Sequence, residues 1–165
     1  MFDTHAYFRT EIESVGRHWR EIMAGFDEAA ALRRPVEDMN HALWLTGHMT
    51  WAEDYLIVEA PTGKFERRKD WDFLFDHTSD RLEAGRYPPW KDVCAEYVRV
   101  HDGVLRHLSR QLPGALAQPS ALNRQWFPTA SHSIAHQVTH GHYHLGQLIY
   151  LQKLLHEHPH AQPNP

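Results

Sequence analysis

The segment THGHYHLGQ, residues 139–147, places three histidines within nine residues and is the part of the chain best suited to metal chemistry. His140 and His144 are four residues apart, so on a helix their side chains share one face, one turn from each other. Two such imidazoles can reach one metal ion without distortion of the backbone. His142 would lie about 200° from His140 around the same helix, so we expect it to face solvent.

The apolar pattern of this helix carries more weight than the histidine spacing, because the chain contains 15 histidines and some pairs four residues apart will arise by chance. Leu148, Leu151 and Leu155 form a core stripe at steps of three and four residues. A further step of four back from Leu148 reaches His144, and one more reaches His140. Both histidines therefore continue the buried stripe and are predicted to point into the protein.

A third metal ligand must come from another segment, and His48 is the best choice. Trp44, His48, Ala52 and Tyr55 share one face of a helix that is predicted to begin after Asn40. His48 is thus an inward histidine with bulky neighbours one turn before it and two turns after it. Three neutral imidazoles leave a tetrahedral metal with one open position, which is the arrangement of a catalytic rather than a structural zinc site.

The other histidines are weaker candidates. His101 falls on or beside the inward face of its helix, so we expect a core or supporting role, with contact to the metal as the alternative. His136 would lie about 12 Å from His144 along the helix axis, too far to share one ion, and is assigned to a supporting or solvated position. Three tail histidines could bind metal loosely: His156, His158 and His160.

Composition narrows the class of protein. The chain has 165 residues, 42% hydrophobic residues and a formal net charge of −4, values typical of one globular domain with no electrostatic preference for nucleic acid. Cys94 is the single cysteine, so no internal disulfide can form. The first residues resemble no signal peptide, and no apolar run approaches a membrane span. We expect a cytoplasmic protein that binds neither nucleic acid nor membrane.

Helical periodicity organises most of the chain. Four amphipathic or apolar segments are predicted to be long helices, at about residues 2–26, 41–61, 89–113 and 131–155. Residues 61–89 are predicted to be a long connection, with a short helical turn around residues 71–75, long enough for a crossover. The predicted fold is an all-α four-helix bundle with long connections. Residues 1–155 would form its single domain, and residues 156–165 a flexible tail rich in proline and histidine.

These residues resemble a family of metalloenzymes, the DinB/YfiT-like proteins, which are unrelated to the DNA polymerase that shares the first name. The segment WLTGHMTWAEDYL resembles the family's single-histidine motif, and HGHYHLGQL resembles its H-x-x-x-H-x-G-Q motif. The resemblance spans nearly the whole chain and implies metal ligands at His48, His140 and His144. The family often has histidine where this chain has Tyr143, a position beside the ligands.

The resemblance implies a divalent metal, with zinc as the first choice and nickel as the alternative, and a homodimer. It also implies transfer of a low-molecular-weight thiol such as bacillithiol or mycothiol to a small electrophile, in detoxification or a stress response. A metal with an open position can lower the pKa of a thiol or of water. No general base is predicted, because Glu59 would lie about 16 Å from His48 along the helix, and Glu53 and Asp54 point away from its face.

Other functions remain open at this point. A metal-dependent hydrolase would use the same site with water in place of a thiol, and a non-enzymatic metal-binding or sensing protein would close the coordination shell. A ferritin-like di-iron protein needs inward Glu-x-x-His motifs, whereas Glu157 to His160 is interrupted by Pro159. Haem binding through one histidine would leave the other two unexplained.

Replacement of His144 by alanine is expected to abolish stoichiometric metal binding while the bundle stays folded. The test is metal analysis on protein truncated after Leu155, which lacks the tail histidines. The control is His142→Ala, because a solvent-facing histidine on the same helix should leave the metal content unchanged. Equal metal content in the two variants would contradict the assignment.

Overall fold

The computed structural model describes residues 3–36, 38–79, 82–112 and 114–157, and within them the regular structure is helical. The described part contains no strand, only an isolated bridge between Pro119 and Thr129. No described helix combines the length and the apolar character that a bilayer crossing needs. The main helices are α1 (Thr4–Met23), α2 (Glu28–Leu32), α3 (Ala42–Asp54), α4 (Ala60–Thr62), α5 (Asp72–Phe75), α6 (Trp90–Ser109) and α7 (Ala130–Glu157).

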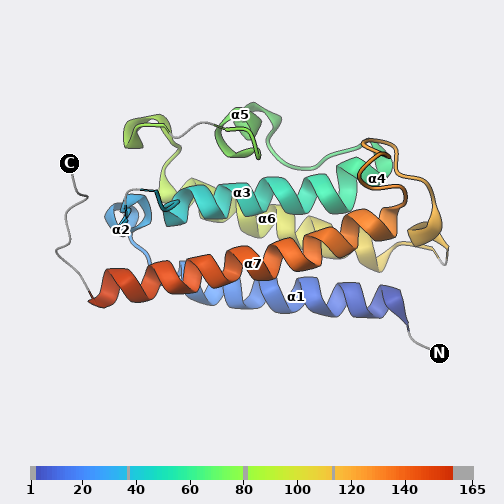
Figure 1. Cartoon of the computed structure of the whole chain (residues 1–165), viewed down its shortest axis with the longest axis horizontal. Helices are drawn as coiled ribbons and strands as arrows, with labels where there is room; N and C mark the ends of the chain where they lie inside the picture. Colours follow the sequence, from blue (N-terminus) through green and yellow to red (C-terminus); the bar gives the residue numbers. More distant parts are fainter. Residues whose placement is uncertain (1–2, 37, 80–81, 113, 158–165) are drawn as a thin grey trace.

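Helices α1, α3, α6 and α7 form a four-helix bundle, which confirms the predicted fold class (Figure 1). α1 and α7 run in the same direction along one side of the bundle, and α3 and α6 run together in the opposite direction. α3 and α6 are consecutive long helices that are parallel, so the chain must return along the bundle between them. The long connection after α4 makes this crossover and carries α5 on the outside of α3.

The predicted apolar stripes form the core. In α1 the apolar residues at helical spacing are buried, Ile22 being half-buried: Phe8, Ile12, Val15 and Trp19. The corresponding residues of α6 are all fully buried: Val93, Tyr97, Val100, Val104 and Leu108. The side-chain carboxylate of Asp3 caps α1 by accepting a hydrogen bond from the backbone N–H of Ala6 at 3.0 Å. The cap of α3 is His41 rather than Asn40, because the His41 ring accepts from the backbone N–H of Trp44. Helix α7 extends two residues into the predicted tail, and the rest of the tail, residues 158–165, lies outside the described residues.

The helix that begins with α3 changes its winding before it ends. Tyr55–Glu59 form a π-helical stretch, η1, between α3 and α4, and Gly63 ends the helix in the left-handed region with φ of 75°. Pro61 has no N–H to donate within the helix. The Leu56 carbonyl instead accepts a 2.5 Å hydrogen bond from the Ser133 hydroxyl of α7. This contact joins the two helices that carry the predicted metal ligands.

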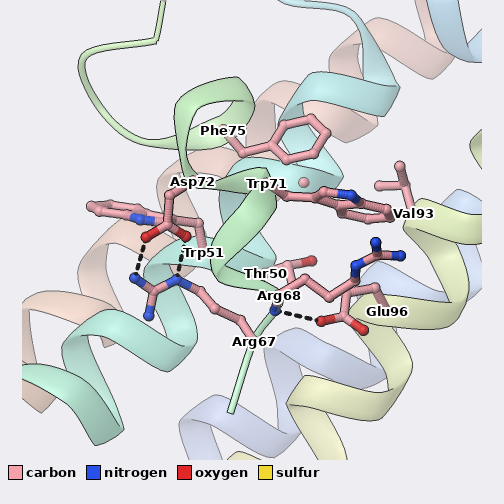
Figure 2. Close-up of a pocket in the computed structure, with 10 residues that line it drawn as sticks. Thr50, Trp51, Arg67, Arg68, Trp71, Asp72, Phe75, Val93 and Glu96 are labelled. Atoms are coloured by element: carbon pink, nitrogen blue, oxygen red, sulfur yellow. Dashed lines mark hydrogen bonds and ion pairs between the residues drawn. The ribbon is translucent and has the colours of Figure 1, made fainter. Parts of the chain in front are cut away.

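A buried arginine fastens the crossover connection to α3. The Arg67 side chain is 3% exposed and forms ion pairs with Asp54 at 2.7 Å, Glu59 at 2.7 Å and Asp72 at 2.8 Å. Figure 2 shows the two-pronged contact with Asp72, the first residue of α5, and the adjacent hydrogen bond from the Arg68 backbone N–H to Glu96 of α6. A guanidinium suits this position because its planar fork can bond several carboxylates at once. The predicted helical turn near residues 71–75 is present as η2 (Lys69–Trp71) and α5.

Replacement of Arg67 by alanine is expected to lower the free energy of unfolding by about 3–5 kcal/mol, because it leaves buried carboxylates without a counterion. Arg68→Ala is the matched control, since its ion pair with Asp70 is exposed and should contribute less than about 1 kcal/mol. Urea denaturation of the two variants provides the comparison. A similar small loss for both would show that the Arg67 network does not hold the connection.

Candidate metal centre

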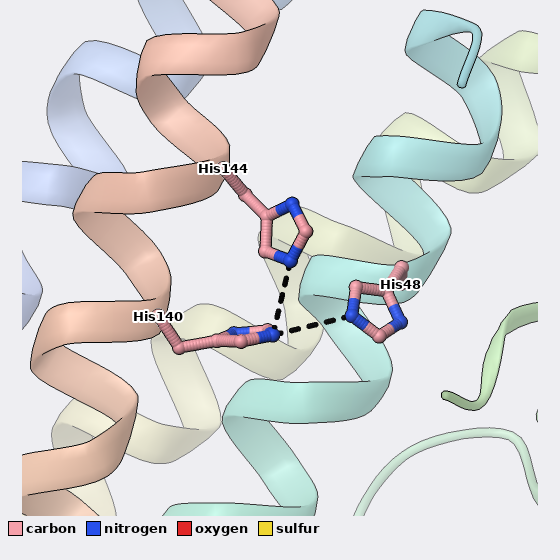
Figure 3. A group of neighbouring side chains, drawn as sticks. All are labelled: His48, His140 and His144. Atoms are coloured by element: carbon pink, nitrogen blue, oxygen red, sulfur yellow. Dashed lines mark hydrogen bonds between the residues drawn. The ribbon is translucent and has the colours of Figure 1, made fainter. Parts of the chain in front are cut away.

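The structure brings His48 of α3 together with His140 and His144 of α7 (Figure 3). The Nε2 atom of His140 lies 3.2 Å from that of His48 and 3.0 Å from that of His144. One ring nitrogen from each histidine lies within 4.8 Å of the other two. The predicted convergence of the three imidazoles is therefore present. In the described part of the chain, no other set of three or more histidine, cysteine or acidic side chains meets this condition.

Hydrogen bonds on the outer side of two rings fix where their protons lie. Nδ1 of His48 donates to the backbone carbonyl of Phe75 at 2.8 Å, and Nδ1 of His144 donates to the side-chain oxygen of Gln147 at 2.8 Å. A neutral imidazole that carries its proton on Nδ1 has a lone pair on Nε2. The Nε2 atoms of His48 and His144 therefore each direct a lone pair toward His140. Such outer contacts are the usual means of orienting histidines toward a metal.

Burial keeps these rings neutral. Removal from water lowers the pKa of His48 to about 4 and that of His140 to about 3, and it also lowers the pKa of His144. His48 and His144 are buried and His140 is half-buried, so none of the three is turned to bulk water. Neutral imidazole is the form that binds metal ions.

The arrangement fits a cation better than it fits three imidazoles alone. His140 can donate from Nε2 to only one of its two neighbours, which leaves at least one lone pair facing another nitrogen. Zinc–nitrogen bonds of about 2.0–2.1 Å would set two ligand nitrogens about 3.4 Å apart on a tetrahedron. The observed separations of 3.0 and 3.2 Å are close to that edge. The three histidines could therefore hold a divalent metal.

The position of His48 depends on the outer connection. Trp44 stacks on its ring with centroids 4.5 Å apart, as the shared helical face predicts. Phe75, which supplies the carbonyl, packs directly over Gly47, where a β-carbon would lie 2.4 Å from the ring. Only glycine permits this approach. Because Arg67 holds α5 against α3, the Arg67 network also fixes the carbonyl that orients His48.

A cavity of about 570 Å³ opens beside the cluster and is lined by His48 and His140. Its walls are mainly aromatic and come from α3 and η1 on one side and from the connection before α7 on the other. Asn123 donates a hydrogen bond to the Tyr55 hydroxyl and so ties that connection to η1. The remaining lining residues are Trp51, Ala52, Leu56, His77, Trp126, Phe127 and His136. The volume is that of a small-molecule site.

The weaker histidine candidates lie outside the cluster. His101 is buried and bonds to Glu53 at 2.8 Å, which gives it the expected core role. His136 is exposed, stacks on His140 with centroids 6.0 Å apart and lines the cavity. His142 is exposed, as predicted, and Tyr143 is exposed with its ring 5.0 Å from that of His144. His156 ends α7 in an exposed position, whereas His158 and His160 lie outside the described residues.

The acidic residues considered as general bases are engaged elsewhere. Glu53 pairs with His101, and Asp54 and Glu59 pair with Arg67. None of them belongs to the histidine cluster in the described part of the chain. The site therefore differs from a carboxylate-rich di-iron centre.

Sequence reasoning missed several residues of the site. Gln147 was visible in the H-x-G-Q motif but had no assigned role. His77, Trp126 and Phe127 lie in connections without helical periodicity, so no pattern in the sequence places them at the cavity. The Phe75 contribution is a backbone carbonyl, which any residue type could supply.

The chain is an all-helical bundle in which three histidines that could hold a metal converge from two antiparallel helices, and sequence comparison identifies its family. Residues 11–148 match the DinB superfamily, and the chain belongs to it. The fold is similar to that of a crystal structure described as the conserved protein of locus from Enterococcus faecalis. That similarity has a TM-score of 0.72 and 17% identity, and it covers 95% of this chain and 99% of the other. Among curated proteins, none matches the sequence.

Replacement of Gln147 by alanine is expected to weaken zinc binding by about 10- to 100-fold, because His144 loses the acceptor that holds its proton on Nδ1. Gln147→Glu keeps an acceptor at the same place and should retain most of the affinity. Competition with a chromophoric chelator measures both dissociation constants. Equal affinities of the wild-type and Gln147→Ala proteins would exclude an orienting role for this residue.

Proposed function

We propose that the protein is a metal-dependent enzyme that transfers a low-molecular-weight thiol to a small electrophile. His48, His140 and His144 would hold the metal, with zinc as the first choice and nickel as the alternative. The observation that carries the proposal is the 570 Å³ cavity lined by two of these three imidazoles. A purely structural metal site would need no such opening.

The residues around the cavity have separate tasks in this proposal. Trp51, Tyr55 and Phe127 provide aromatic surface against which an apolar electrophile can pack. Trp126 is 73% exposed and forms the outer part of the same wall. His77 lines the cavity without belonging to the histidine cluster, and its imidazole can accept the proton that a thiol loses.

A divalent metal bound to three histidines supplies a Lewis acid with an open position, which lowers the pKa of a thiol. The Phe75 carbonyl and the Gln147 side chain keep two of the ligands oriented, and burial keeps all three neutral. The aromatic walls limit access of water to the reacting sulfur. Membership of the DinB superfamily is compatible with this proposal, since the family that the sequence resembles includes thiol S-transferases.

The test is a transfer assay on zinc- and nickel-loaded protein with 1-chloro-2,4-dinitrobenzene and a panel of bacillithiol, mycothiol, glutathione and cysteine. In this reaction the sulfur bonds to the ring carbon, chloride leaves, and the thiol proton passes by way of His77 to the buffer. We expect turnover with at least one thiol. We expect loss of turnover in His140→Ala, together with loss of the metal.

The Trp126→Ala variant distinguishes the role of the cavity from the role of the metal. This variant should keep its metal and raise KM for the electrophile, because only the outer wall is removed. Phe73→Ala is the matched control, since Phe73 is 63% exposed and is not part of the cavity lining. The proposal would be overturned if no thiol supported turnover, or if His140→Ala turned over as fast as the wild type. Hydrolysis of a nitrophenyl ester by the metal-loaded protein would instead support the hydrolase alternative.

A further inference from the structure

A second cavity, of about 360 Å³, lies at the beginning of α3, away from the histidine cluster. Figure 1 shows α2 beside this end of α3. The cavity is lined from α2 and the residues after it, from the first turn of α3 and from the crossover connection. Its lining residues are Ala29, Leu32, Arg33, Arg34, His41, Leu82, Glu83 and Ala84. The metal centre and its own cavity use none of these residues.

His41, which lines this cavity, carries a hydrogen-bond donor without a partner. Its Nδ1 atom accepts from the backbone N–H of Trp44 at 2.9 Å, so in the neutral ring the proton must lie on Nε2. Nε2 is buried and has no hydrogen-bond partner, and the residue is only 2% exposed. A buried donor without a partner costs about 1–3 kcal/mol, so such groups in folded proteins call for an explanation. Edge-to-face packing against Tyr87, with centroids 4.9 Å apart, holds the ring in this orientation.

Arg34 adds positive charge next to this donor. Burial, together with the nearby Arg34 cation, lowers the pKa of His41 to about 4. The Nε atom of Arg34 is itself buried without a hydrogen-bond partner. The lining contains two arginines and one acidic residue, Glu83, whose side chain is exposed. The Arg34 cation thus lies next to the His41 ring, whose Nε2 has no partner.

The N-terminus of α3 adds a partial positive charge near the Arg34 cation. α3 begins at Ala42, directly after His41, and continues through η1 and α4 to Thr62. The N-terminus of a long helix carries partial positive charge and attracts anions. Two N–H groups of this turn are already used, since Trp44 donates to the His41 ring and Leu45 to the His41 carbonyl. The helix therefore supplies the field, and the side chains of His41 and Arg34 supply free donors.

We propose that this cavity is a binding site for a small organic anion, whose oxyanion group accepts hydrogen bonds from Nε2 of His41 and Nε of Arg34. The volume is larger than an inorganic oxyanion requires. Leu32, Leu82 and Ala29 form an apolar part of the wall that can contact the carbon portion of the ligand. The ligand class is thus a phosphate monoester or a carboxylic acid, ionised at neutral pH, with a small apolar body.

The test uses phenyl phosphate, inorganic phosphate and phenol as probes, with binding followed by calorimetry and by amide chemical shifts of α3. We expect saturable binding of phenyl phosphate, weaker binding of inorganic phosphate and none of phenol. His41→Asn keeps a capping side chain at the start of α3 but removes the Nε2 donor, and Arg34→Gln removes the cation. Each should weaken phenyl phosphate binding by about tenfold or more, since a hydrogen bond to a charged group is lost.

Arg110→Gln is the matched control, because Arg110 is an exposed arginine at the end of α6, and it should bind like the wild type. The inference does not rest on the proposed thiol transfer. His140→Ala, which removes a proposed metal ligand, should leave phenyl phosphate binding unchanged. The inference would be overturned if phenyl phosphate showed no saturable binding, or if His41→Asn and Arg34→Gln bound it with wild-type affinity. Loss of binding in His140→Ala would also overturn it and would show that the anion binds at the metal.

Discussion

Three imidazole nitrogens that meet in a buried place impose the main constraint on this structure. Outer hydrogen bonds hold the protons of His48 and His144 on the far side of each ring, so their lone pairs face His140. Neutral rings avoid charge repulsion, yet the single proton that His140 can place on Nε2 satisfies only one neighbour, so at least one nitrogen pair stays unsatisfied unless a cation lies between the rings. A bundle that keeps this arrangement must fix both helices despite that unsatisfied pair, and it must do so from outside the cluster.

Two contacts between distant segments provide this support. On the inner side, Ser133 of α7 donates to the Leu56 carbonyl in the π-helical stretch and joins the two ligand-bearing helices. On the outer side, Arg67 binds α5 to α3, and α5 brings the Phe75 carbonyl to His48. Because Gly47 has no side chain, the Phe75 ring can pack closely enough for the Phe75 carbonyl to accept the hydrogen bond from His48. The crossover connection thus supports the candidate metal centre, although it contributes none of the three histidines.

The predictable features are those that helical periodicity determines. The stripe through Leu148 and Leu151 shows that His144 and His140 point inward, and the stripe through Trp44 does the same for His48. The cavity could not be predicted, because His77 and Trp126 reach it from connections whose path depends on tertiary contacts. The cap of α3 was assigned to Asn40, a residue with a high capping propensity, whereas His41 fills this position through a ring nitrogen.

His48 precedes His140 by 92 positions in the chain, whereas His144 follows His140 by four. During synthesis, a chain that has emerged only as far as α6 offers a single imidazole of the set, and the other two appear together on the last long helix. An ion bound to all three would close a loop of more than half the protein and stabilise only the completed bundle. Metal loading would therefore be the final event of folding, and a chain that has taken up its ion has already docked its C-terminal helix.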